Sequence, residues 1–451
     1  MMFMRTTTPQ KLLILLLTFG LIAIRAHSHI LTALSGQFPQ ILATATAGDT
    51  IRVASGRHDI TNMVISTPNL FIIGKEDATI YGNGTGSILT IDAPNVVVKN
   101  LKIEHTGRMV DKDDAGIRIQ SSKIRIEHCT FSDYALAIYL QRATQVTITK
   151  CTFSGDSIPK EAITGNSIHA YLSSGILVES GTFRNGLDGI YFDVCNEIIA
   201  RHNRMTDVRY GVHFMNCRDG IASDNGVTSS FVGIAAMFSN NVSVRYNRTD
   251  NNIRANAYGI LLQDVDTAIV EGNEIGGNDN GLLMEATRHS KISDNLIIAN
   301  RVGMELHSSS NTSRVRHNRF ITNWETVVRK QWMHETNYDV SFSGNYFSNA
   351  VIPDADGDGY GDAPYRIEDA FTARYAEQPV LSLMRATKAY TIWNSLLQNS
   401  STNNGLYDIR PARYSTIGGY QAPTRAKIIL TILFCIVTIP AYTGFYRWLR
   451  R

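Results

Sequence analysis

Three side chains that can bind a soft metal ion lie close together in the sequence: His213, Met215 and Met237. Imidazole nitrogen and thioether sulfur form a soft ligand set, which suits Cu(I) better than a hard cation. Because only two or three ligands are on offer, we expect weak or transient binding, which fits a protein that delivers copper better than one that stores it. The alternative is that the methionines form an apolar patch covered by the C-terminal segment or by a partner.

A second group of possible metal ligands lies in the stretch DADGDGYGDAPY, which ends at Tyr365. Carboxylates occupy positions one, three, five and nine of a calcium-loop pattern: Asp354, Asp356, Asp358 and Asp362. Gly359 provides the turn at position six, but position twelve is Tyr365 and not an acid, so Glu368 would have to replace it. We expect a structural calcium ion here, and a solvated acidic turn is the alternative.

His213, Met215 and Met237 lie within a repeat of 22 residues. Glycines mark it, with one interval of 26 residues: Gly189, Gly211, Gly233, Gly259, Gly281 and Gly303. An apolar–x–apolar pair follows each glycine, which indicates a β-strand. Asparagines follow the first five glycines by fourteen residues: Asn203, Asn225, Asn247, Asn273 and Asn295. Short strands repeated in register can bury their apolar faces only by stacking, so we predict an all-β, right-handed parallel β-helix with three strands per coil and an asparagine ladder at one corner.

The phase of this repeat predicts which way each side chain points. If the first and third residues after a glycine face the interior, the second and fourth face outward. His213, Met215 and Met237 then share the outer face of one sheet. Met215 and Met237 would lie on neighbouring coils about 4.8 Å apart, and His213 about 7 Å from Met215 along its strand. We therefore expect the three side chains to be able to converge on one ion.

Four cysteines also follow the repeat. Cys129 and Cys151 take the corner position that asparagine takes elsewhere, and Cys195 and Cys217 each lie six residues after a glycine. Neighbouring coils bring each pair within Cα range of a disulfide, but side chains stacked in register point in parallel, which is poor disulfide geometry. We expect small buried ladder residues, and a zinc site would need closer cysteine spacing.

The composition is that of a globular protein. The chain has 451 residues, of which 43% are hydrophobic and 18% are charged. Its net charge is only +3, and the basic stripe expected of a nucleic-acid-binding protein is missing. We therefore expect no nucleic-acid partner.

The sequence predicts an export signal at the N-terminus and a membrane-spanning segment at the C-terminus. Basic residues precede an apolar run at Leu12–Ile24, which predicts a signal peptide at 1–28, with an uncleaved anchor as the alternative. Nineteen residues without an acid or base, Ile428–Tyr446, precede three arginines. They predict a transmembrane helix with a basic cytoplasmic tail at 426–451, and a buried helix is the alternative. Between them we expect the β-helix at 29–350 and a calcium-loop-like C-terminal extension at 351–425.

The stretch Asp188–Ser239, with its YGVHFM and VGIAAMF elements, and the later DADGDGYGDAPYRI together resemble the NosD family of periplasmic accessory proteins in nitrous oxide reductase maturation. The likeness extends from about Ile30 to Leu383. It implies a copper-handling role beside an ABC transporter with ATPase and permease subunits, with nitrous oxide reductase or another copper protein as client. It points to His213, Met215 and Met237 as ligands. A C-terminal membrane helix departs from the soluble members that we expect, and would tether the protein to the periplasmic face of the inner membrane or mark a divergent paralogue.

Polysaccharide lyases, epimerases and glycosidases are the competing class, because β-helices often carry such enzymes on an outward sheet. Their chemistry needs paired carboxylates or a base with an acid partner. Asp193 with Glu285, or Glu305 with His307, are the candidates, but we expect them to sit singly among apolar neighbours, with the first two four coils apart. We therefore expect a protein that is not an enzyme. A third possibility is a solenoid that binds sugar or protein through these residues: Tyr171, Tyr191, Leu261 and Leu283.

Overall fold

A computed structural model describes residues 28–109, 112–155, 165–330, 339–368, 384, 387–390 and 405–415. Nearly all of the predicted signal peptide, the whole predicted transmembrane helix and most of the predicted extension lie outside these residues. Within them, no helix combines the length and apolar character needed to cross a membrane.

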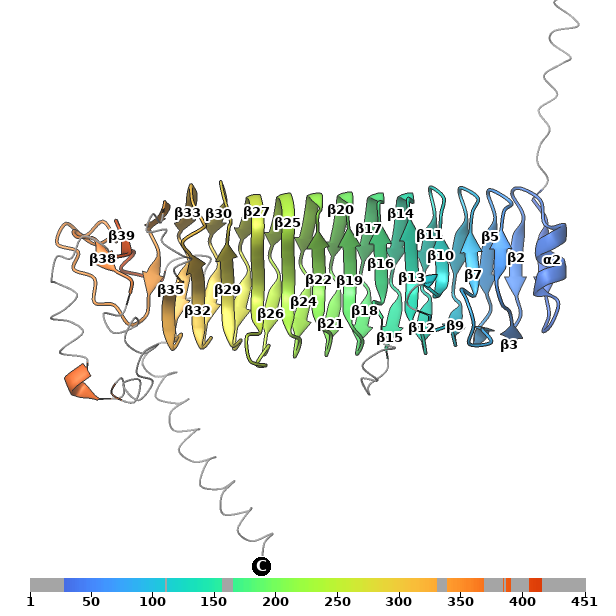
Figure 1. The fold of residues 1–451 in the computed structure, drawn as a ribbon, viewed down its shortest axis with the longest axis horizontal. Helices are drawn as coiled ribbons and strands as arrows, with labels where there is room; N and C mark the ends of the chain where they lie inside the picture. Colours follow the sequence, from blue (N-terminus) through green and yellow to red (C-terminus); the bar gives the residue numbers. More distant parts are fainter. Residues whose placement is uncertain are drawn as a thin grey trace, which may run out of the picture.

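The described chain forms one elongated stack of coils (Figure 1). Successive coils pair through parallel strands, and the third strands of the coils form a continuous 13-stranded sheet. The predicted parallel β-helix is therefore confirmed. Each coil contributes one strand to each of three faces, which we call the first, second and third sheets.

The first sheet contains the glycines of the repeat. Its strands are β4 (Met63–Ile65), β7 (Leu89–Ile91), β10 (Ala115–Ile119), β13 (Leu136–Gln141), β16 (Ile168–Tyr171), β19 (Asp188–Asp193), β22 (Tyr210–Met215), the first halves of β25 (Val232–Arg245) and β27 (Tyr258–Glu271), β29 (Asn280–Glu285), β32 (Val302–His307) and β35 (Glu325–Lys330).

The second sheet follows it in each coil. Its strands are β1 (Ile30–Ala33), β2 (Thr50–Val53), β5 (Phe71–Gly74), β8 (Val97–Lys99), β11 (Arg125–Glu127), β14 (Thr144–Thr149), β17 (Ser174–Glu179), β20 (Asn196–Arg201), β23 (Arg218–Ser223), the second halves of β25 and β27, β30 (Lys291–Ser293), β33 (Ser313–Arg316) and β36 (Val340–Ser343).

The third sheet closes each coil. Its strands are β3 (Gly56–Asp59), β6 (Ala78–Tyr81), β9 (Lys102–Glu104), β12 (Thr130–Ser132), β15 (Thr152–Ser154), β18 (Thr182–Arg184), β21 (Arg204–Thr206), β24 (Gly226–Thr228), β26 (Arg248–Asp250), β28 (Glu274–Gly276), β31 (Leu296–Ile298), β34 (Arg319–Ile321) and β37 (Tyr346–Phe347). A short helix, α2 (Phe38–Thr44), lies at the N-terminal end, and β38 (Tyr365–Arg366) pairs with β39 (Tyr407–Asp408) at the other.

Residues that face inward form one continuous core along the stack. Aromatic rings stack from coil to coil, as Phe192 does on Phe214 with ring centroids 5.6 Å apart. Burying each such side chain contributes about 1.5–3 kcal/mol. The core therefore holds the coils in register, and the register in turn positions the side chains on the outer faces.

The predicted asparagine ladder is confirmed. Asn203 donates from its backbone and side-chain amides to the side-chain oxygen of Asn225, both at 3.0 Å. The same pattern continues through Asn345, whose amides donate to Asp408 of β39. A second ladder, which we did not predict, follows five residues later in successive coils: Asn252, Asn278, Asn300 and Asn323.

The cysteines are confirmed as buried and free: Cys129, Cys151, Cys195 and Cys217. Cys217 donates from Sγ to the carbonyl oxygens of Phe192 (3.3 Å) and Met215 (3.2 Å). Burial raises the pKa of Cys195 to about 11 and that of Cys217 to about 12. Both thiols therefore stay protonated at neutral pH and are poor metal ligands in this state.

Candidate metal site

The repeat places the three predicted copper ligands on the outer face of the first sheet. His213 and Met215 lie on β22, and the register pairs Met215 with Met237 of β25. Phe214, between the first two, is fully buried in the core. The two methionines are half-buried, whereas His213 is only 4% exposed. The imidazole therefore faces outward but is covered by its neighbours.

Two tyrosines cover the His213 ring. Tyr191, on the preceding coil, lies with its ring centroid 4.8 Å from that of His213. Tyr210, on the same strand, meets the imidazole edge-on at 4.6 Å. These contacts fix the plane of the imidazole, so that its two nitrogens point in defined directions.

The two nitrogens of His213 have different surroundings. Nδ1 lies 3.1 Å from a carboxylate oxygen of Asp188, which is itself fully buried. Nε2 is buried and has no hydrogen-bond partner in the described part of the chain. Since an ionised carboxylate favours a proton on Nδ1, the lone pair of Nε2 is free to bind a metal ion.

Arg209 keeps the Asp188 carboxylate ionised. Its guanidinium donates to both carboxylate oxygens, with Nε at 2.7 Å and Nη2 at 2.9 Å. Burial acts to raise the pKa of Asp188, but the hydrogen bonds from His213 and Arg209 outweigh it and lower that pKa. Metal-binding histidines commonly donate their other nitrogen to a carboxylate in this way.

The glycine row explains why Asp188 reaches His213. A Cβ at Gly189 would lie 2.9 Å from the carbonyl oxygen of Gly211, and one at Gly211 would lie 2.5 Å from that of Gly233, so a larger residue does not fit. Residues that precede glycines of the row also contact the outer face: Asp188 meets His213, and Tyr210, Val232 and Tyr258 belong to the outer apolar cluster with Ala235 and Leu261. We missed Asp188 and Arg209 because we counted only positions after each glycine as outward.

An aromatic row extends from His213 towards the N-terminal coils. Ring centroids 4.7–5.2 Å apart connect four residues on successive rungs: Tyr139, His169, Tyr191 and His213. In the described part of the chain, Nε2 of His169 also has no hydrogen-bond partner, and burial lowers the pKa of this imidazole. The row was visible in the sequence only as a column of the repeat, and we assigned roles to Tyr191 and His213 but none to Tyr139 or His169.

An apolar cluster continues from His213 in the opposite direction. Its buried members are Val232, Ala235, Leu261 and Leu283, and half-buried Met237 packs against them. The alternative of an apolar methionine patch therefore has a structural basis. An apolar methionine patch and a Cu(I) site are compatible. Apolar surroundings disfavour hard, hydrated cations and leave the thioether available to a soft metal ion.

Further along, the expectation that the outward acids sit singly is wrong. Glu305 accepts hydrogen bonds from His307 at 2.8 Å and lies 2.9 Å from the Lys330 ammonium. The other nitrogen of His307 lies 3.8 Å from Glu285. Glu305 is 4% exposed, and although burial acts to raise its pKa, the bonds from His307 and Lys330 lower it. Asp193 stays apart from this group, four rungs from Glu285.

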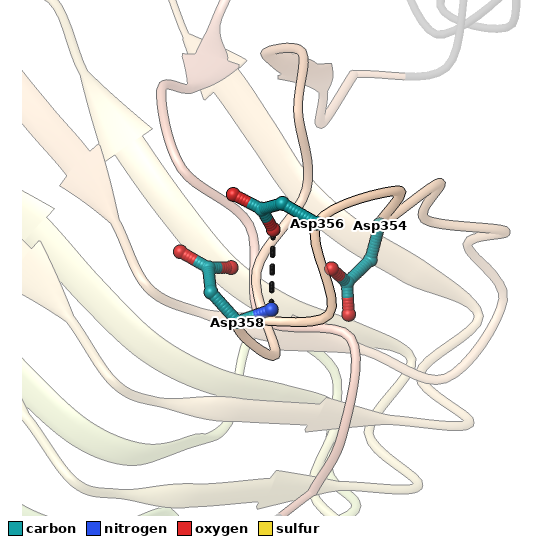
Figure 2. Close-up of side chains that lie close together, drawn as sticks. All are labelled: Asp354, Asp356 and Asp358. Atoms are coloured by element: carbon teal, nitrogen blue, oxygen red, sulfur yellow. Dashed lines mark hydrogen bonds between the residues drawn. The ribbon is translucent and has the colours of Figure 1, made fainter.

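The acidic loop brings three of its four carboxylates together. Figure 2 shows Asp354, Asp356 and Asp358 around one turn, and their ligand atoms lie within 4.8 Å of one another. Asp362 is not in this group, and one of its oxygens accepts the backbone N–H of Ala355 at 2.8 Å.

Two arginines compete for the same carboxylates. Arg410 donates to Asp358 at 2.6 Å and Arg413 lies 3.4 Å from Asp354. Glu368, which we expected to replace the missing ligand at position twelve, bonds Arg329 and the backbone N–H of Leu406. The loop therefore offers a three-carboxylate site whose charge is already partly neutralised.

Comparison with known families agrees with the sequence resemblance. Residues 149–351 match the family described as periplasmic copper-binding protein (NosD), and residues 47–159 match the right-handed β-helix region. A probable ABC transporter binding protein NosD from Pseudomonas aeruginosa is 27% identical, over 70% of this chain and 76% of its own length. One from Stutzerimonas stutzeri is 26% identical, over 65% and 70%. The resemblance to NosD and the right-handed coil are confirmed.

Solved structures share the fold at much lower identity. The Dettilon tailspike protein has a TM-score of 0.51 at 13% identity, over 67% of this chain and 68% of its own. A family 28 exopolygalacturonase from Yersinia enterocolitica has a TM-score of 0.51 at 9% identity, over 73% and 80%. At these identities the likeness concerns the β-helix alone.

Proposed function

We propose that this NosD-like protein binds Cu(I) through His213, Met215 and Met237 and delivers it during maturation of a copper enzyme, with nitrous oxide reductase as the client. The observation that carries this proposal is the buried Nε2 of His213, unpartnered in the described structure, on the same face of the sheet as Met215 and Met237, which pair in register. An imidazole held by a carboxylate and flanked by thioethers offers a soft, three-ligand site.

The surroundings of the three ligands favour transient loading. Met215 and Met237 are only half-buried, so part of each residue remains open to an exchanging partner. His213 is locked by Asp188, Tyr191 and Tyr210, so the nitrogen donor needs little rearrangement to bind. A fixed imidazole beside partly exposed methionines suits capture followed by release.

The names of the relatives support an ABC transporter as the partner. Both NosD relatives are named ABC transporter binding proteins, and the matching family is described as periplasmic. We propose that this chain works beside an ABC transporter at the periplasmic face of the inner membrane, anchored by its C-terminal apolar segment. A fractionation of cells that express the full chain and a chain ending at residue 425 tests the anchor. Release of only the shorter chain into the periplasm is the expected result.

A Cu(I) titration tests the metal site. The purified protein competes with a chromogenic Cu(I) chelator under anaerobic conditions. We expect Met215→Leu/Met237→Leu to weaken binding about tenfold or more because two of the three ligands are lost, which corresponds to about 1.4 kcal/mol or more of binding free energy.

A matched control comes from the opposite face of the same sheet. Met284 and Met304 are fully buried inward residues, so Met284→Leu/Met304→Leu changes the same atoms without touching the site. We expect this control to bind Cu(I) like the wild type. Equal affinity for the wild type and the Met215/Met237 variant would exclude the site.

We also propose a structural calcium ion in the loop of Asp354, Asp356 and Asp358, with Asp362 nearby. Calcium that binds only the folded protein must raise its melting temperature. The measurement is thermal unfolding with calcium, with magnesium as the control, for the wild type and for Asp356→Asn/Asp358→Asn. No rise in the wild type would show that Arg410 and Arg413 alone neutralise the loop.

One observation favours a second candidate function. Glu305, His307, Glu285 and Lys330 form a connected acid–base cluster on the outward sheet, where a polysaccharide could lie. Incubation with alginate or pectate measures uronic acid release, with Glu305→Gln as the control. We expect no release, and activity that disappears in Glu305→Gln would establish the enzyme in place of the copper carrier.

A further inference from the structure

One row of corner residues borders the candidate copper site. These residues end the first sheet on successive rungs, and backbone bonds connect each to the preceding position of the next coil. Leu172 donates to the carbonyl of Asp193, Val194 to that of Met215 and Asn216 to that of Met237, at 3.0–3.1 Å. The row continues with Phe238, which directly follows Met237.

Every member of this row has left-handed backbone. The φ angles are 50° for Leu172, 53° for Val194, 53° for Asn216 and 49° for Phe238. This conformation favours glycine, asparagine and aspartate, and a β-branched residue adopts it only under steric strain. Asn216 is therefore the expected kind of residue, whereas its three neighbours are not.

The three apolar residues are unusual within this protein as well. Leu172 is 37% exposed, Val194 42% and Phe238 52%. Among the described residues with left-handed backbone and a side chain, Tyr246 at another corner is the only other bulky hydrophobic one. Neither burial nor backbone preference accounts for Leu172, Val194 and Phe238, which we call the apolar corner row.

The position of the apolar corner row relates it to the metal site. It extends over four rungs, about 14 Å, along the edge next to Met215 and Met237, with Asn216 on the rung between Val194 and Phe238. Exposed Arg142 precedes it on the same corner, and Asp264, which lies 3.7 Å from the Arg288 guanidinium, follows it, so charged groups border both ends. An apolar centre with a charged rim is the usual anatomy of a protein–protein interface.

We propose that the apolar corner row is the docking surface for the protein that takes copper from His213, Met215 and Met237, an inference that rests on the proposed function. The partner has an apolar patch around its own copper site, with an acidic group opposite Arg142. In the transfer, the bonds from copper to the two thioethers and the imidazole break as acceptor ligands bind. Copper remains Cu(I), so no electron acceptor or donor is needed.

The test replaces the row with residues that suit its backbone. Leu172→Asn/Val194→Asn/Phe238→Asn keeps the left-handed corner, because asparagine accepts this conformation readily. The Cu(I)-loaded protein is mixed with copper-free nitrous oxide reductase, the two are separated by size, and copper in each is measured over time. We expect transfer at least tenfold slower than from the wild type, with unchanged Cu(I) affinity.

Tyr246→Asn provides the matched control, because Tyr246 is 61% exposed and has the same backbone conformation at a different corner. We expect it to transfer copper like the wild type. Transfer from the triple variant at the wild-type rate, or no transfer from any of the proteins, would overturn the docking surface. Neither outcome would alter the Cu(I) affinity, which tests the proposed function separately.

Discussion

The outer face of the first sheet carries two buried polar groups that occupy the same position of the repeat. His213 and Glu305 each lie two residues after a glycine, and each is 4% exposed. Glu305 is fully engaged by His307 and Lys330, whereas His213 uses one nitrogen on Asp188 and leaves the other unpartnered in the described structure. The repeat thus determines burial and direction, while the neighbouring rungs determine whether a group remains available to a ligand.

The difference arises from side-chain size on adjacent rungs. Ala235 is the register partner of His213 on the next rung, and its methyl group offers no hydrogen-bond partner to the imidazole. On the rung next to Glu305, Lys330 pairs in register with His307, and its long side chain reaches the Glu305 carboxylate diagonally. A buried group that its neighbours satisfy stabilises the fold, and one left unsatisfied costs stability unless a ligand binds it. The comparison therefore predicts different responses to substitution in the two regions.

The largest effect is expected at Asp188. Asp188→Ala leaves the guanidinium of Arg209 and the imidazole of His213 without their carboxylate, and we expect a loss of about 3 kcal/mol in the free energy of unfolding. Denaturant unfolding measures this loss. Asp193→Ala, at an outward position on the same strand, is the control and should cost less than about 1 kcal/mol. Equal costs at both positions would show that Asp188 does not organise the site.

A smaller effect is expected at Glu305. Glu305→Gln keeps the shape and one acceptor oxygen for His307, and Lys330 is 53% exposed and can turn to solvent. We expect the free energy of unfolding, measured by denaturant unfolding, to fall by about 1–2 kcal/mol. Cu(I) affinity should not change, so a copper defect in this variant would contradict the separation of the two regions.

Glu305→Gln should also change how the stability of the folded protein depends on pH. The pKa of Glu305 is lowered in the folded protein below its ordinary value of 4.5, so its contribution to stability is complete above that value and is lost as pH falls through the folded-state pKa. Unfolding of the wild type and Glu305→Gln at pH 7 and pH 3.5 measures the difference. We expect the difference in free energy of unfolding between the wild type and Glu305→Gln to be smaller at pH 3.5 than at pH 7. An equal difference at both pH values would contradict an ionised Glu305 in the folded protein.

Sequence periodicity predicted the coil, the outward phase of the repeat, the asparagine ladder and the free cysteines, because each depends on local alternation and a constant interval. It missed Asp188, since strict alternation does not hold across Gly189: the register pairs Asp188 with Tyr210 and Ile190 with Val212, and Asp188 contacts outward-facing His213. It missed the cluster around Glu305 because long side chains reach diagonally between rungs. The end of the ladder at Asp408, 63 residues beyond Asn345, has no periodic signal at all.

The smallest change in stability is expected at His213 itself. His213→Phe keeps an aromatic ring between Tyr191 and Tyr210 and removes the buried Nε2, so the lost bond to Asp188 is largely offset by the removal of an unsatisfied nitrogen. We expect the free energy of unfolding to fall by about 1 kcal/mol or less, while Cu(I) affinity falls about tenfold or more. The same replacement at His307 removes a satisfied ring and should affect stability more than copper. If His213→Phe destabilised the fold as much as His307→Phe and left Cu(I) binding intact, the unpartnered nitrogen would have no role in metal binding.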